Sequence, residues 1–365
     1  MRRIRPQRPA DIAAAPVPTE AYNRDWINRL DSVEALRAIA FFMVFVFHAF
    51  LEFNTGSDGL VGVIYSNPWG YFFPHHVGAF GVQLFFVISG FCIHRSALRW
   101  REAHAGARGR DWIVHYAQSR FLRIYPAYLL VVLTLFALTP VAWVDLVAHV
   151  LLIQTLIPGT VNQINPSLWS LAVEAQLYAL YPLALFAMTG SRAPLIIAAC
   201  AGASLIWRLV APEHTLWAKA PLFWGFEWWL GVAVAQTATM QRWIGWRTWL
   251  AGLAATLVVL APTRIDALYA TLPPVLFAAL LGLLIRRPQR APRWLIATGA
   301  VSYGLYLVHQ PVLAWVADIA GAAGADVAMM GAFFVASAAG LGAALAIAVP
   351  LERAGRWFQS RFTAR

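Results

Sequence analysis

The sequence predicts an all-α fold: a polytopic transmembrane helix bundle of about ten spans plus one short re-entrant or interfacial helix. Three observations predict it. Of the 365 residues, 60% are hydrophobic and only 12% are charged, which is too little charge for the surface of a soluble domain. Apolar runs of about 20 residues recur along the chain. Arginines cluster in the gaps between these runs, as the positive-inside rule describes.

The apolar runs and the arginines between them place each span and its direction. Six arginines precede the first run, so we expect the chain to start in the cytoplasm. Ten runs then bring both termini to that side. The expected spans cover residues 33–51, 78–93, 121–137, 168–188, 194–210, 221–239, 249–262, 269–285, 294–316 and 325–350.

One further apolar piece, residues 143–157, is marginal in length for a span and contains Asp145, His149 and Gln154. We interpret it as a re-entrant or interfacial helix on the outer side. As a full span it would reverse every later loop and place the arginines at 286–293 and 353–365 outside.

The domain organisation follows from this topology. Residues 1–30 are expected to form a disordered cytoplasmic tail, 31–351 one integral membrane domain, and 352–365 a short basic cytoplasmic tail. The net charge of +11 is topogenic, so we expect no nucleic-acid partner. Cys92 and Cys200 make no metal or disulfide pattern.

The first run carries Arg37 and His48, eleven residues apart. This spacing puts both side chains on one helical face, about 16 Å apart along the axis. Polar titratable groups inside a span often mark a substrate path or a relay. A structural histidine with a snorkelling arginine is an equally good interpretation.

Two further polar stripes and one arginine pair are candidates. Arg120 and Arg123 share a face at the cytoplasmic end of the third expected span and suit phosphate binding, or are plain topogenic charges. Glu174 forms a stripe with Ser170, Tyr178 and Tyr181 on span 168–188. His309 forms another with Ser302 and Tyr306. Structural hydrogen bonding is the alternative for both stripes.

These positions suggest an enzyme that passes a group across the bilayer. The arginine pair faces the cytoplasm, whereas His48, Glu174 and His309 lie toward the outer leaflet. A secondary transporter remains the alternative, although we find no inverted repeat. A non-catalytic scaffold would not need such converging polar stripes.

Five segments resemble the membrane-bound acyltransferase-3 family, and they occur in that family's order. The resemblance covers roughly residues 30–351. The segments are LDSVEALRAIAFFMVFVFH (30–48), GVQLFFVISGF (81–91), RFLRIYP (120–126), SLWSLAVEAQLYALYP (167–182) and SYGLYLVHQP (302–311).

The resemblance implies an integral O-acyltransferase of the inner (plasma) membrane. Its partners would be cytoplasmic acyl-CoA, with acetyl-CoA as the expected donor, the lipid bilayer, and a carbohydrate or lipid-linked glycan acceptor. No metal and no tightly bound cofactor are implied. One departure is Gln83, where many members have an acidic residue. A soluble domain that some members carry after the last span would here need a separate protein.

The expected mechanism assigns a role to each candidate. His48 is the general base, since the ordinary pKa of imidazole lies near working pH. Glu174 or His309 orients this imidazole or holds the acceptor, and an acyl-His48 intermediate is the alternative. Arg37 positions the donor. The other assignments are Arg120 and Arg123 to CoA phosphates, and Tyr178, Ser302 and Tyr306 to substrate.

Overall fold

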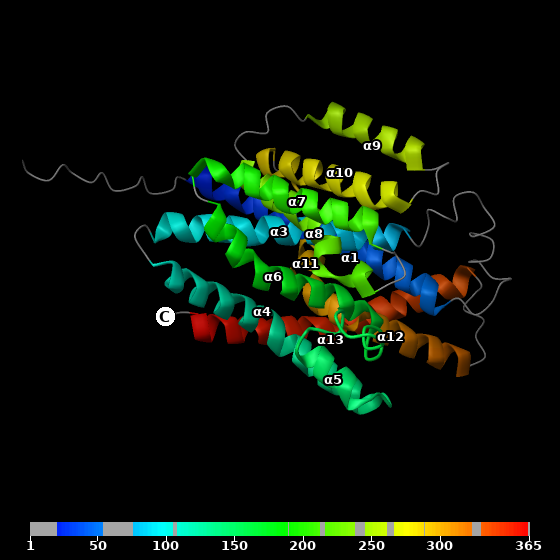
Figure 1. Cartoon of the computed structure of the whole chain (residues 1–365). Coiled ribbons are helices and arrows are strands. Elements are labelled where there is room, and N and C mark those ends of the chain that lie inside the picture. Colours follow the sequence, from blue (N-terminus) through cyan, green and yellow to red (C-terminus); the bar gives the residue numbers. More distant parts are fainter. Residues whose placement is uncertain are drawn as a thin grey trace, which may run out of the picture.

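The computed structural model describes residues 20–53, 76–104, 108–188, 190–211, 216–237, 245–260, 266–287, 289–322 and 330–363. Within these ranges the chain is helical and contains no strand. The helices pack side by side into one bundle, with α9 at one edge and α5 projecting from the opposite edge (Figure 1). This confirms the predicted all-α transmembrane fold.

The described residues contain twelve α-helices and three 3-10 helices. Their bounds are α1 Glu20–Glu52, α3 Val77–Ala103, α4 Gly109–Leu138, α5 Trp143–Val150, α6 Trp169–Ala187, α7 Ala193–Val210, α8 Pro221–Thr237, α9 Trp246–Leu260, α10 Asp266–Arg286, α11 Arg293–Ala300, α12 Ser302–Ala322 and α13 Met330–Thr363. The 3-10 turns are η3 Pro166–Leu168, η4 Gly190–Arg192 and η5 Leu216–Lys219.

Seven helical segments in the described residues are long and apolar enough to cross a membrane. They belong to α1, α3, α4, α6 with η3, α7, α10 and α13. Helices α8, α9 and α12, which occupy three of the ten expected spans, are not among them. Seven spans are therefore supported by length and apolarity.

The short apolar piece forms α5, eight residues and about 12 Å long, followed by turns. It is too short to cross a bilayer. Its polar side chains point inward: Asp145 and His149 are buried, and the Tyr128 hydroxyl donates to the His149 carbonyl at 2.9 Å. Burial lowers the pKa of His149, which favours the neutral imidazole.

Several expected boundaries were wrong, since α1, α3, α4 and α13 extend beyond the apolar runs expected for them. The run 294–316 is not one helix, because α11 ends at Ala300 and α12 starts at Ser302. At this break Gly299 lies against the backbone of Glu34, where a Cβ atom would overlap the Glu34 carbonyl. The last helix, α13, continues through Pro350 to Thr363. Apolarity marks only the part of a helix that lies in lipid, so it misses polar extensions.

Glycines let the backbone of α3 lie directly against the backbones of α1 and α8. A Cβ atom on Gly81 would lie 2.6 Å from the Ala40 carbonyl oxygen of α1. On the other side, a Cβ atom on Gly90 would overlap the Trp228 carbonyl, and one on Gly231 would overlap the Val87 carbonyl. Small residues let helix backbones approach closely in membranes.

A buried ion pair ties α7 to α8 and α10. Arg208 Nη2 donates to Glu227 Oε2 at 2.6 Å, and Arg208 Nη1 donates to the Ala270 carbonyl at 2.6 Å. Both side chains are almost fully buried.

Candidate functional site

His48 and His309 meet in the core between α1 and α12. The distance from His309 Nε2 to His48 Nδ1 is 3.1 Å, and their ring centroids are 4.8 Å apart. His309 is fully buried and His48 is 9% exposed. Two histidines that are 261 residues apart in sequence therefore form one dyad.

Backbone carbonyls determine which nitrogens of the dyad carry hydrogen. His309 Nδ1 lies 2.8 Å from the Tyr306 carbonyl, and His48 Nδ1 lies 3.0 Å from the Val44 carbonyl. A carbonyl only accepts, so both Nδ1 atoms must donate. In the neutral rings, His309 Nε2 carries no hydrogen, so the single hydrogen on His48 Nδ1 is shared between the Val44 carbonyl and His309 Nε2. His48 Nε2 keeps a free lone pair, as a general base requires.

The start of α6 holds α12 in place beside the dyad. Asn165 accepts from the backbone amide of Ser167 at 3.0 Å, and its own amide donates to the Leu307 carbonyl at 3.2 Å. The Tyr306 hydroxyl donates to the Ser167 carbonyl and accepts from Ser170 Oγ at 2.6 Å. The residues before the WSLAVE segment thus fix the position of His309.

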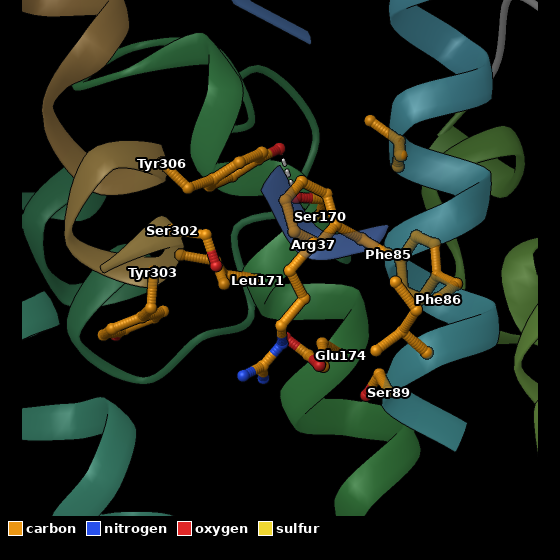
Figure 2. Close-up of a pocket in the computed structure, with 12 residues that line it drawn as sticks. Arg37, Phe85, Phe86, Ser89, Ser170, Leu171, Glu174, Ser302, Tyr303 and Tyr306 are labelled. Atoms are coloured by element: carbon orange, nitrogen blue, oxygen red, sulfur yellow. Dashed lines mark hydrogen bonds between the residues drawn. The ribbon is translucent and has the colours of Figure 1, made fainter. Parts of the chain in front are cut away.

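Glu174 lies in a second group, around a cavity that we call the central cavity (Figure 2). The Tyr178 hydroxyl donates to Glu174 Oε1 at 2.5 Å. Because that hydrogen is used, Ser89 Oγ must donate to the Tyr178 oxygen, 2.9 Å away. This chain connects α3 to α6. Glu174 therefore has Tyr178 as its partner, whereas His48 has His309.

The central cavity lies between α1, α3, α6 and α12 and has a volume of about 80 Å³. That is room for several water molecules or a short acyl chain. Figure 2 shows Arg37, Glu174 and Ser302 around it. Apolar side chains complete its wall: Val82, Phe85, Phe86, Ile88 and Leu171.

A neighbouring hollow, the basic cavity, has a volume of about 160 Å³. Its charged lining residues are Glu34, Arg37, Arg123, Glu352 and Arg356. Arg37 and Tyr303 line both cavities, so the two adjoin. The lining residues of the basic cavity come from the middle of α1, from α4, α11 and α12, and from the C-terminal third of α13. Helix α1 starts and α13 ends on the same side of the bundle (Figure 1).

The two predicted phosphate-binding arginines differ in position. Arg123 lines the basic cavity, and no hydrogen bond or ion pair to it is present among the described residues. Arg120 lines neither cavity, and its Nε atom is buried without a hydrogen-bond partner in that part of the chain. Arg37 makes a 3.3 Å ion pair with Glu34.

Tyr306 separates the central cavity from the dyad. Its ring lines the cavity, and its centroid lies 5.4 Å from that of His309. Phe85 meets the Tyr306 ring edge to face at 5.7 Å. Neither histidine of the dyad lines either cavity. Tyr306 is therefore a contact between the central cavity and the dyad.

Sequence reasoning missed several polar residues near the site. Asn165 and Ser167 precede α6 in an N-cap pattern that could have shown them. Tyr303 follows Ser302 in the same segment but is off the stripe that we followed. Gln83, the departure from the family pattern, donates to the Tyr269 carbonyl at 3.2 Å and connects α3 to α10.

Comparison with known families identifies the family of this chain. The family model described as an acyltransferase domain matches residues 30–353, which is most of the chain. The chain belongs to the acyltransferase-3 family. No curated protein matches it, and no solved structure matches it. Membership of this family, with the apolar helices, makes the protein a membrane acyltransferase.

Proposed function

We propose that this acyltransferase moves an acyl group, acetyl in the simplest case, from cytoplasmic acyl-CoA to a hydroxyl of a surface or secreted glycan. The observation that carries the proposal is the His48–His309 dyad, whose hydrogen bonds leave His48 Nε2 unprotonated. A lone pair at that atom can accept a proton from a hydroxyl group.

In the chemical step, His48 first takes up a proton and then gives it back. The acceptor hydroxyl gives its proton to His48 Nε2, and its oxygen attacks the thioester carbonyl carbon. The carbon–sulfur bond then breaks, and the imidazolium returns the proton to the leaving thiolate. The alternative first step is attack by Nε2 itself, which gives an acyl-histidine that the alcohol then resolves.

His309 stabilises the charged form of the base in this proposal. When His48 becomes an imidazolium, its Nδ1–H becomes a stronger donor to His309 Nε2, which lies 3.1 Å away. His309 cannot turn away easily, because its own Nδ1–H is held by the Tyr306 carbonyl. His309 is thus a positioning residue for His48.

The donor would enter through the basic cavity. Arg123 and Arg356 line it, and guanidinium groups bind phosphate through several donors at once. Arg37, which lines both cavities, would then guide the thioester into the central cavity. Tyr306 has to swing away from Ser170 for the acyl carbon to reach His48.

This route implies a topology with both termini in the cytoplasm, ten crossings in the bilayer of the inner membrane, and α5 on the outer side. The arginines at the start of α1 and at the end of α13 support that orientation. The acceptor would reach the dyad from the opposite face. Donor and acceptor thus stay on different sides of the membrane.

Purified full-length protein in lipid vesicles tests the proposal. Acyl-CoA cleavage is measured as the release of free thiol, with and without added methyl glycosides. We expect glycoside-dependent release, and we expect His48→Ala to reduce it by about 10²- to 10⁴-fold, the usual contribution of a positioned base.

The exposed histidine His104 provides the control, because its hydrogen bond and its ring stacking in the described part of the chain are to Trp100 of α3. His104→Ala should keep full activity. Undiminished transfer by well-inserted His48→Ala protein would refute the base assignment. An absence of thiol release with every donor would point to the transporter alternative.

A further inference from the structure

A second polar pair lies next to the dyad on the same two helices. Glu52 follows His48 by one helical turn on α1, and Gln310 directly follows His309 on α12. Gln310 Nε2 donates to Glu52 Oε1 at 3.2 Å. This pair lies farther along α1 from Arg37 than the dyad does, so it is on the side of the dyad away from the basic cavity.

The orientation of the Gln310 amide follows from its partner. A carboxylate oxygen accepts from the amide nitrogen, so Gln310 Oε1 has to point elsewhere. Gln310 is 6% exposed, and its Oε1 atom is buried with no hydrogen-bond partner in the described part of the chain. A buried acceptor without a donor costs about 1–3 kcal/mol. A ligand that donates to it would recover this energy.

Among the described residues, the surroundings of the dyad therefore offer acceptors that no donor pairs with. His48 Nε2 has a free lone pair, Gln310 Oε1 is unpaired, and the Glu52 carboxylate is half-buried. A molecule with several hydroxyl groups supplies the missing donors. An anionic molecule would be repelled by Glu52 and by the exposed Asp318 carboxylate nearby.

We propose that Glu52 and Gln310 form the acceptor subsite, and that the acceptor is a neutral sugar ring with two neighbouring free hydroxyl groups. One hydroxyl is the nucleophile and donates to His48 Nε2. The next hydroxyl donates to Gln310 Oε1, and Glu52 holds the amide in place. This inference rests on the proposed acyltransferase function, and it names the class of molecule that accepts the acyl group.

The test uses the full-length protein in lipid vesicles with acetyl-CoA as donor and methyl hexopyranosides as acceptors. The glycoside that gives the fastest thiol release is paired with each of its monodeoxy derivatives. With wild-type protein, we expect thiol release to be about tenfold faster with the parent glycoside than with one of the derivatives. This is the effect expected from the loss of one buried hydrogen bond.

Gln310→Ala should raise the acceptor KM about tenfold, leave the acetyl-CoA KM unchanged, and remove the preference against that deoxy sugar. Glu52→Gln keeps the side-chain size and should raise the acceptor KM in the same direction by less. Asp318→Asn is the matched control, because it also removes one carboxylate from this region. It should leave both KM values unchanged.

The outcomes separate this inference from the proposed function. If Gln310→Ala keeps the deoxy preference, or raises the donor KM equally, the acceptor subsite is elsewhere. If Gln310→Ala does not accumulate, Glu52→Gln decides, and an unchanged acceptor KM overturns the inference. If wild type releases no thiol with any glycoside, the proposed function itself fails.

Discussion

At the residue scale, the chemistry of the site depends on two carbonyl groups. The carbonyls of Val44 and Tyr306 each accept from the Nδ1 atom of a histidine one turn away on the same helix. Each helix thereby sets the protonation of its own imidazole. The contact between the rings then orders the two histidines, so that His309 accepts and His48 has the free lone pair.

This arrangement predicts how His309 variants behave. His309→Ala removes the acceptor that stabilises the His48 imidazolium, so we expect kcat to fall about 10²-fold with little change in the donor KM. His309→Gln restores an acceptor oxygen and should recover part of that loss. Thiol release at saturating donor measures it. Equal losses in the two variants would indicate a purely structural role.

At the element scale, the site depends on how closely α3 can lie between α1 and α8. Gly81 faces α1, while Gly90 and Gly231 face each other's helices across the α3–α8 contact. Gly81 and Gly90 thus pack α3 against two different helices, because small residues at different positions along a helix point in different directions.

We predict that Gly90→Ala destabilises the protein, because its Cβ atom would overlap the Trp228 carbonyl and force two helix backbones apart. The expected cost is about 1–3 kcal/mol. Thermal unfolding of detergent-solubilised protein measures it as a lower midpoint. Gly202→Ala on α7 is the control, since nothing lies within 4 Å of its added Cβ atom. An unchanged midpoint for Gly90→Ala would contradict this packing.

At the scale of the whole molecule, charge is distributed unevenly along the bundle. The basic cavity is lined by Arg37, Arg123 and Arg356 together with Glu34 and Glu352, and it lies on the side of the dyad toward the start of α1. The end of α1 carries Glu52, beside Gln310. An anionic donor and a neutral acceptor would thus approach the dyad from opposite ends.

This asymmetry predicts an effect on the donor alone. Arg123→Ala should raise the acyl-CoA KM about 10- to 100-fold, which matches the loss of a hydrogen bond to a charged group, and leave the acceptor KM unchanged. Arg353→Ala, an exposed arginine of α13 outside the cavity lining, is the matched control. Equal donor KM values in all three proteins would place the phosphate site elsewhere.

Helical periodicity identified the residues of the site but not which of them contact one another. The stripes correctly place Ser302, Tyr306 and His309 on one helix, and Glu174 with Tyr178 on another. Helical spacing cannot tell which stripes face each other, so it left both Glu174 and His309 as partners of His48. In the structure His309 lies at hydrogen-bond distance from His48, whereas Glu174 accepts a hydrogen bond from Tyr178.

The sequence by itself determined the fold class, the family and the short α5, because apolar length, arginine distribution and motif order are local properties of the chain. Only the tertiary structure decided that α11 and α12 are separate, that Arg208 pairs with Glu227, and that Gln310 joins Glu52. These features depend on which helix faces meet, and side chains far apart in sequence acquire partners only when the bundle packs.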